Sequence, residues 1–202
     1  MPDYTIVAGP NGAGKSTYSG RLSEPGSLIF DADKIKAIKE REYPDTPPES
    51  IQTMLTVEYW EMEEAAINDG INLTVESNLQ NNFLIERAGH LKSKGFTTNL
   101  IFMLLPSIDE SIERVNSRVG QKGHFVDFES IKYNFENSLE MLKNHHAKFD
   151  NVQVINSFFQ GTKSKLQLLL TIHNNTISYI SENTPFWAKP IIDELVQNLS
   201  IN

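Results

Sequence analysis

Short hydrophobic runs alternate along the chain with longer segments in which apolar residues recur every three or four positions. Short apolar runs predict buried strands, whereas the three-and-four spacing predicts amphipathic helices. The predicted strands are residues 4–8, 27–30, 71–75, the apolar part of 96–105, and 152–155. The predicted helices are residues 33–41, 50–69, 83–94, 107–119 and 129–146. This alternation predicts a three-layer α/β sandwich with a central, mostly parallel sheet flanked by helices.

Proline and glycine mark boundaries between these elements. Pro44, Pro47 and Pro48 predict that residues 42–49 form a loop, because proline removes a backbone donor and restricts the residue before it. Gly70 follows the longest helical pattern and predicts its end.

The C-terminal part of the chain has a weaker pattern. It predicts a helix over residues 166–172, a short strand over 176–180 and an amphipathic helix over 190–199. A chain of 202 residues is long enough for one well-buried core. We therefore expect a single domain, with its core at about residues 4–156 and a C-terminal extension at about 157–202.

Composition narrows the class of protein. The chain has 18 Lys and Arg against 26 Asp and Glu, a net charge of -8. This balance disfavours a nucleic-acid partner, since binding a phosphate backbone requires clustered positive charge. The absence of cysteine excludes disulfides and cysteine-ligated metals. Apolar runs such as 100–106 are far too short to span a membrane, so we expect a cytoplasmic protein with access to ATP.

A complete phosphate-binding loop follows the first predicted strand. It fits the template Gly-x-x-x-x-Gly-Lys-[Ser/Thr]. The loop is made of Gly9, Pro10, Asn11, Gly12, Ala13, Gly14, Lys15, Ser16 and Thr17. Such a loop turns its N–H groups toward phosphate oxygens, while Lys15 reaches the β and γ phosphates and the Ser16 hydroxyl ligates Mg²⁺. The sequence therefore predicts a P-loop NTPase fold that binds ATP or GTP with Mg²⁺.

Acidic residues follow two other predicted strands. Asp31 and Asp33 come after the second strand, and Glu76 with Ser77 comes after the third. Ligands of open parallel sheets bind at the carboxyl ends of the strands, where a carboxylate can accept a proton, hold Mg²⁺ or bind substrate hydroxyls. Either aspartate can instead cap the next helix, and we favour Asp33 as the chemical one. Glu76 can alternatively be a solvated strand-end acid.

Basic residues cluster near residue 120. Arg114 and Arg118 are four positions apart, and either can stabilise charge on a transferring phosphoryl group. Arg114 can equally form a helix salt bridge with Glu110, whereas Arg118 has no acidic residue four positions before it. Lys122 and His124 lie in the polar segment that follows and can close over ATP.

The remaining histidine pair, His145 and His146, has no acidic partner at metal-ligand spacing. We expect both residues at the surface.

Taken in order, these motifs resemble those of the zeta toxin family of P-loop kinases. The resemblance covers about residues 4–156. The matching motifs are the phosphate loop, Asp31-x-Asp33, Glu76-Ser77, and Arg118-Val119 followed by Gly123-His124-Phe125-Val126. It implies an ATP-dependent phosphotransferase that acts on a sugar hydroxyl, with UDP-N-acetylglucosamine and related UDP-sugars as the acceptors known for the family.

The resemblance also implies roles for single residues. Asp33 resembles the catalytic base of the family, Glu76 an acceptor-site acid, and Arg118 an arginine that reaches the ATP phosphates. Lys15 and Ser16 resemble the phosphate and Mg²⁺ residues. The substrate-binding set then includes Asp31, Glu76, Ser77 and His124.

The chain departs from the family at two positions. Many relatives carry further arginines in the helix after the Gly-His segment, where this chain has Asn134 and Asn137. A nucleotide-binding interaction module with little or no catalysis is therefore an alternative to the kinase. A transporter-type ATPase is disfavoured because the chain lacks a Leu-Ser-Gly-Gly-Gln-like signature, and a polynucleotide kinase by the acidic balance. The family also suggests an antitoxin as a protein partner.

Overall fold

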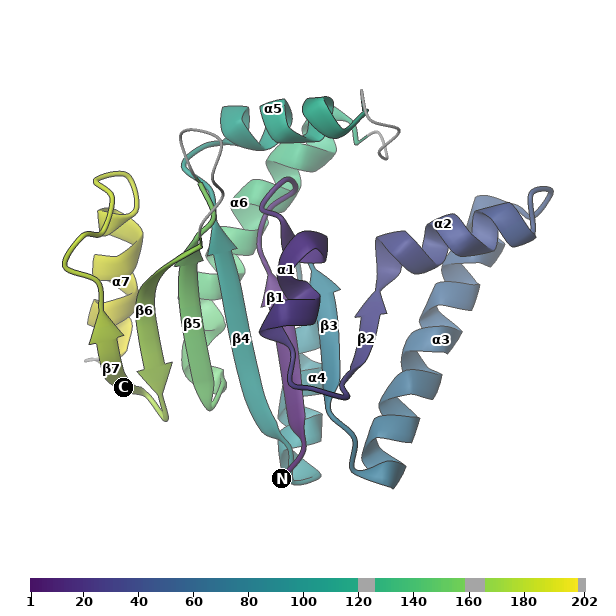
Figure 1. The fold of residues 1–202 in the computed structure, drawn as a ribbon, viewed down its shortest axis with the longest axis horizontal. Coiled ribbons are helices and arrows are strands. Elements are labelled where there is room, and N and C mark those ends of the chain that lie inside the picture. The colour runs from purple at the N-terminus through teal and green to yellow at the C-terminus, as the bar shows by residue number, and fades with distance from the viewer. Residues whose placement is uncertain (120–125, 159–165, 200–202) are drawn as a thin grey trace.

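The computed structural model describes residues 1–119, 126–158 and 166–199 (Figure 1). The strands are β1 (Asp3–Ala8), β2 (Leu28–Asp31), β3 (Leu73–Ser77), β4 (Thr97–Leu104), β5 (Asn151–Asn156), β6 (Gln167–His173) and β7 (Thr176–Ile180). The helices are α1 (Lys15–Leu22), α2 (Ala32–Glu42), α3 (Pro48–Asp69), α4 (Phe83–Ser93), α5 (Ile108–Val119), α6 (Phe128–His145), the 3-10 turn η1 (His146–Lys148) and α7 (Lys189–Leu199).

All seven strands form one sheet, in the order β2-β3-β1-β4-β5-β6-β7. Strands β1 to β5 are parallel, and β6 and β7 are antiparallel. The predicted α/β class with a mostly parallel, helix-flanked sheet is confirmed. Strand β1 lies between β3 and β4, and Val7 of β1 is paired with Glu76 of β3. The phosphate loop therefore leaves the sheet beside the end of β3.

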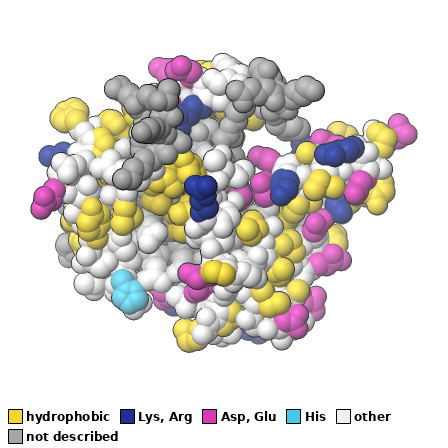
Figure 2. All heavy atoms as spheres, viewed as in Figure 1, with side chains coloured by type: hydrophobic (Ala, Val, Ile, Leu, Met, Phe, Trp, Pro, Cys, Tyr) yellow, Lys and Arg dark blue, Asp and Glu magenta, His cyan; other side chains and the backbone are white. Residues whose placement is uncertain are grey.

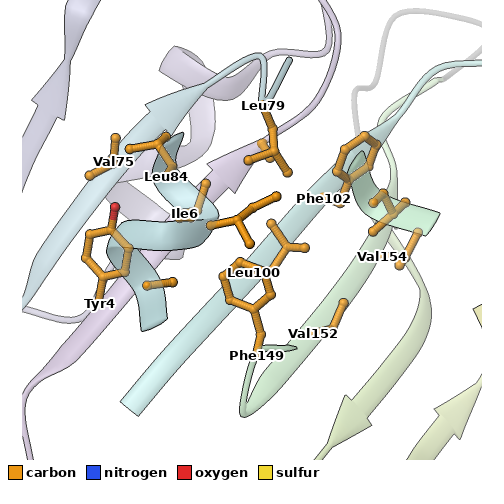
Figure 3. Packing of buried hydrophobic residues seen from close by; sticks show 14 of the residues in the cluster. Tyr4, Ile6, Val75, Leu79, Leu84, Leu100, Phe102, Phe149, Val152 and Val154 are labelled. Carbon is orange, nitrogen blue, oxygen red and sulfur yellow. The ribbon is translucent and has the colours of Figure 1, made fainter. Parts of the chain in front are cut away.

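Successive side chains of the central strands alternate between the two faces of the sheet. One face of β1 and β4 carries Val7 and Met103, which pack with Tyr18 and Leu22 of α1. The other face carries the larger core, part of which is drawn in Figure 3. This core includes Tyr4, Ile6, Val75, Leu84, Leu100, Phe102, Phe149, Val152 and Val154. In Figure 1, α1 lies in front of the sheet and α4 and α6 lie behind it.

The sheet continues beyond β5 as a hairpin. The turn between β6 and β7 consists of Asn174 and Asn175, with φ angles of 45° and 59°. Positive φ at both central residues is typical of a two-residue hairpin turn whose twist matches the strands, and asparagine tolerates it. Helix α7 then packs against α6, and its residues Ile192 and Leu195 belong to the main core.

The predicted helix over residues 166–172 is wrong, because this segment forms β6. Its register against β5 shifts between Val154, which pairs with Leu170, and Ile155, which pairs with Leu168. Leu169 is thereby the extra residue of a bulge, and both Leu169 and Leu170 are fully buried. Because these two neighbouring leucines are both buried, the segment lacks the alternation of apolar and polar residues that identifies a strand in a sequence.

Two smaller predictions also need correction. The loop predicted over residues 42–49 is shorter, because Pro48 is the first residue of α3, a position where proline is well suited. His146 is buried rather than at the surface, and its Nδ1 lies 3.1 Å from the carbonyl oxygen of Leu142. His145 is half-buried.

Among the helices of the described residues, none combines the length and the apolar character that crossing a membrane would require.

Candidate functional site

The phosphate loop joins β1 to α1, and glycine is required at two of its positions. Gly9 has a φ of 141°, and a Cβ there would lie 2.4 Å from the carbonyl oxygen of Met103. Gly12 has a φ of 80°, and its Cβ would lie 2.9 Å from Cβ of Arg114. Larger residues are excluded by both the backbone conformation and the space. Helix α1 begins at Lys15, so its positive dipole end faces the loop.

Lys15 links this loop to the end of β3. Its Nζ donates to the carbonyl oxygens of Gly9 at 2.8 Å and Pro10 at 3.1 Å, and to Oδ1 of Asn78 at 2.8 Å. The ammonium group is therefore held at the mouth of the loop, where the phosphates of a nucleotide would lie.

Glu76, at the end of β3, is a buried acid. Its carboxylate accepts hydrogen bonds from the hydroxyls of Ser19 and Ser16. The alternative that Glu76 is a solvated strand-end acid is therefore wrong. Burial raises the pKa of Glu76 above its ordinary value, the hydrogen bonds from Ser19 and Ser16 oppose the rise, and the charge of Asp31 adds to it.

The pairing of Ser16 with Glu76 also fits a magnesium ion. A hydroxyl and a carboxylate beside a phosphate loop are oxygen donors of the kind that Mg²⁺ prefers, and Mg²⁺ completes its coordination with phosphate oxygens and water. Among the described residues, no three His, Asp or Glu side chains form a self-sufficient metal cluster.

The two aspartates after β2 have different surroundings. Asp31 is the N-cap of α2, and its Oδ1 accepts a hydrogen bond of 3.1 Å from the backbone N–H of Lys34. Asp33 lies in the first turn of α2 and is exposed. Of the two aspartates that could cap the helix, Asp31 is the one that does so.

Arg114 of α5 forms the helix salt bridge that was one of its two predicted roles, and it also contacts the phosphate loop. Its Nε donates to Oε1 of Glu110 at 2.5 Å, which is the helix salt bridge. Its Nη1 donates to the carbonyl oxygens of Gly12 at 3.4 Å and Ser157 at 3.0 Å. Arg114 therefore holds the backbone of the phosphate loop at Gly12.

Three predicted basic residues lie outside what the structure describes. Arg118 belongs to α5, but its side chain is not among the described ones. Lys122 and His124 lie in the segment 120–125, outside the described residues.

The two asparagines at positions where the resemblance implies arginine differ in their contacts. Asn134 of α6 is buried, and its Nδ2 donates to Oδ1 of Asn11 in the phosphate loop at 2.8 Å. Asn137 donates to the carbonyl oxygen of Tyr133 in the same helix at 2.8 Å. Only one of the two positions therefore contacts the loop.

A cavity of about 400 Å³ brings the phosphate loop and the strand-end acids together. Lys15, Ser16, Asp31, Asp33, Glu76 and Ser77 all line it. A second hollow of about 650 Å³ adjoins it, and Asp33 lines both. Arg114, which was predicted to contact ATP, contacts the loop backbone at Gly12 and lines neither cavity.

Sequence reasoning missed the apolar wall of the first cavity. This wall is made by Phe30, Leu55, Tyr59, Phe83 and Leu84. Phe83 is 42% exposed and opens α4 just after the polar stretch that follows β3. Its position after the Glu76-Ser77 motif was the signal that could have identified it.

The face drawn in Figure 2 has its Lys and Arg side chains scattered among acidic and hydrophobic ones, rather than gathered in a basic patch.

The parallel sheet, the phosphate loop and the acids at its edge define a P-loop protein with a kinase-like fold. The sequence identifies the group within this class. The family model described as zeta toxin matches residues 1–176, so the chain belongs to the zeta toxin family.

Individual proteins and solved structures are similar to the chain at low sequence identity. An uncharacterised protein of Haemophilus influenzae is 26% identical over 135 residues, which cover 64% of this chain and 90% of the relative. The AvrRxo1-ORF1:-ORF2 structure with ATP has a TM-score of 0.66 at 10% identity, over 97% of this chain and 64% of that one. The PezAT toxin-antitoxin structure of Streptococcus pneumoniae has a TM-score of 0.54 at 15% identity, over 100% of this chain and 88% of that one. At such low identity the two structures support the fold alone.

Proposed function

We propose that this protein is an ATP-dependent kinase that transfers the γ-phosphate to a hydroxyl group of a small molecule. The observation that carries the proposal is the shared cavity, which is lined by the phosphate-loop residues Lys15 and Ser16 and by the carboxylates of Asp33 and Glu76. Phosphoryl transfer requires mainly that the reactants be positioned and that negative charge be stabilised.

The residues divide the chemistry between them. The loop N–H groups and Lys15 hold the triphosphate and neutralise charge on the transferring group. Asp33 accepts the proton of the acceptor hydroxyl while the hydroxyl oxygen forms a bond to the γ-phosphorus. The bond from this phosphorus to the β–γ bridging oxygen breaks, and ADP leaves. Ser16 would hold Mg²⁺ directly and Glu76 would hold it through water. Mg²⁺ bound there supplies further positive charge to the β and γ phosphates. Arg118 is proposed to add charge from α5, with Ser77 and His124 on the acceptor side.

Labelled ATP offered with sugars, UDP-sugars and nucleosides tests this proposal. UDP-N-acetyl sugars serve as the reference acceptors because the family resemblance implies them. Labelled product is expected in the presence of Mg²⁺. ATP binding without any labelled product would instead favour the nucleotide-binding interaction module.

The variant Asp33→Asn tests the assignment of the base. It should keep ATP binding and lower transfer by about 10²- to 10⁴-fold, the usual contribution of a general base. Asp45→Asn is the matched control, since Asp45 is an exposed aspartate in the turn before α3 that lines neither cavity. Normal turnover by Asp33→Asn would refute the assignment.

The PezAT structure comes from a toxin-antitoxin system, which makes an antitoxin partner a hypothesis for this chain as well. Growth arrest on expression, abolished by Asp33→Asn, would support that hypothesis.

A further inference from the structure

We infer that Asn78 is a positioning residue of the nucleotide site. Its carboxamide oxygen holds the ammonium group of Lys15, and a phosphate oxygen of the nucleotide replaces it there on binding. This inference rests on the proposed function, because that function assigns Lys15 to the phosphates of ATP. Three features carry it: the contact of Asn78 with Lys15, the fixed positions of the other two acceptors, and the strained turn that presents Asn78.

The oxygens around Lys15 match the number of its donors. An ammonium group has three N–H donors and no acceptor. Nζ of Lys15 lies 2.8 Å from the carbonyl oxygen of Gly9, 3.1 Å from that of Pro10 and 2.8 Å from Oδ1 of Asn78. Because Lys15 can only donate, the oxygen of the carboxamide and not its nitrogen must face the ammonium group. A phosphate oxygen that binds Lys15 must therefore compete with these three oxygens.

Two of the three oxygens belong to the backbone of the phosphate loop. The backbone at Gly9 lies so close to β4 that a Cβ there would be 2.4 Å from the carbonyl oxygen of Met103. The carbonyl oxygen of Pro10 also accepts a hydrogen bond of 3.2 Å from the backbone N–H of Ala13. Moving either carbonyl would distort the loop whose N–H groups bind phosphate. Asn78 contributes a side chain that can rotate about χ1 and χ2, so its oxygen is the acceptor that leaves.

A strained turn directly after β3 presents Asn78 to the loop. Leu79 has a φ of 53°, in the left-handed region that residues other than glycine rarely adopt. Its N–H donates to Oγ of Ser77 at 2.9 Å, and its side chain is buried in the main core. Strained residues of this kind persist only where their surroundings fix them, and they cluster at functional sites. The turn fixes the backbone beside Asn78, whose half-buried side chain lines both cavities and can turn into them.

Calorimetric titration of ADP with Mg²⁺ onto the full chain tests the inference, because Lys15 reaches the β phosphate as well as the γ phosphate. Asn78→Leu removes the competing oxygen with little change in side-chain size. The affinity for ADP should therefore rise about 2- to 10-fold, in line with the net strength of one hydrogen bond. Asn78→Asp places a carboxylate on the same ammonium group and should lower the affinity about 10- to 100-fold, because a pair of ionised partners is harder to displace.

Gln80 supplies the matched controls. It carries the same carboxamide group and lines both cavities, but it is not one of the three oxygen acceptors described for Lys15. Gln80→Leu should not raise the affinity for ADP. Gln80→Glu adds the same charge as Asn78→Asp and should lower the affinity only about 2- to 3-fold, through repulsion of the phosphates at longer range. Urea unfolding checks that each variant is folded, and Asn78→Ala replaces Asn78→Leu if the leucine variant is not.

The opposite signs at Asn78 separate this role from a structural one, because damage to the site would lower the affinity for ADP in both variants. An affinity of Asn78→Leu no higher than that of the unchanged protein would overturn the inference, as would equal losses in Asn78→Asp and Gln80→Glu. Neither result would bear on the proposed kinase, since the titration contains no acceptor and involves no transfer. Failure of the unchanged protein to bind ADP would count against both.

Discussion

The buried ion pair between Glu63 and Arg87 allows a stability prediction worked from the structure. The Glu63 side chain is 3% exposed and that of Arg87 is 21% exposed. The change Arg87→Met would leave the carboxylate buried with the Tyr59 hydroxyl as its remaining donor among the contacts described. Breaking a buried pair costs about 3–5 kcal/mol, and the partial exposure of Arg87 reduces this to roughly 2–4 kcal/mol. For a chain of this length, that corresponds to a Tm lower by roughly 5–15 °C.

Urea unfolding followed by circular dichroism measures this loss. The double variant Glu63→Gln with Arg87→Met removes the uncompensated charge, while the amide oxygen introduced in place of the carboxylate can still accept from Tyr59, so most of the stability should return. The matched control is Lys36→Met, which breaks an exposed ion pair with Glu40 of 3.8 Å. An exposed pair of this kind contributes about 0–0.5 kcal/mol. The reasoning is refuted if Arg87→Met costs no more than Lys36→Met, or if the double variant is no more stable than Arg87→Met alone.

Two further changes test single polar contacts. Asn134→Leu removes the donor to Asn11 and should weaken ATP binding about 2- to 10-fold in a calorimetric titration, given the usual strength of one hydrogen bond. Asn137→Leu should leave ATP affinity unchanged, and equal losses in both variants would contradict the role of the Asn134 contact with Asn11. The second change concerns Asp150, whose pKa burial alone would raise, but hydrogen bonds from Lys92 and from Thr98 lower it below its ordinary value. A carboxylate with a lowered pKa stabilises the fold above about pH 4, and this stabilisation is lost as the pH falls through the pKa of the folded state. Asp150→Asn should therefore lower the free energy of unfolding by about 1–2 kcal/mol at pH 7 and by less at pH 3. A difference in urea midpoint that grows on acidification would contradict the sign.

The fold could be predicted where local sequence determines the structure. The strand at residues 4–8, the phosphate loop and the long helix ended by Gly70 each have a short-range signal of hydrophobic period or glycine position, and each lies close to where it was expected. The segment 166–172 could not be predicted in this way. Its strand depends on the open edge of β5 and on a bulge at Leu169, and neither is visible in a local window.

The surroundings of the site residues were harder to predict, because they depend on partners far away in the sequence. Glu76 is held in its buried position by a hydrogen bond from Ser19, which is 57 positions distant. Asn134 reaches Asn11 across 123 positions. The apolar wall of the first cavity joins residues of β2, α3 and α4 in the same way, so neither its existence nor its exposure follows from the spacing of its members.

The contacts of the three acids at the strand ends also separate their roles. The carboxylate of Asp31 faces the N-terminus of α2, where it accepts a hydrogen bond from the backbone N–H of Lys34. Glu76 is committed to the serine hydroxyls beside the phosphate loop. Asp33 is exposed and lines both cavities, so its carboxylate is accessible to an acceptor hydroxyl. A proton acceptor must meet its substrate within hydrogen-bond distance, and accessibility therefore favours Asp33 over both neighbours as the base.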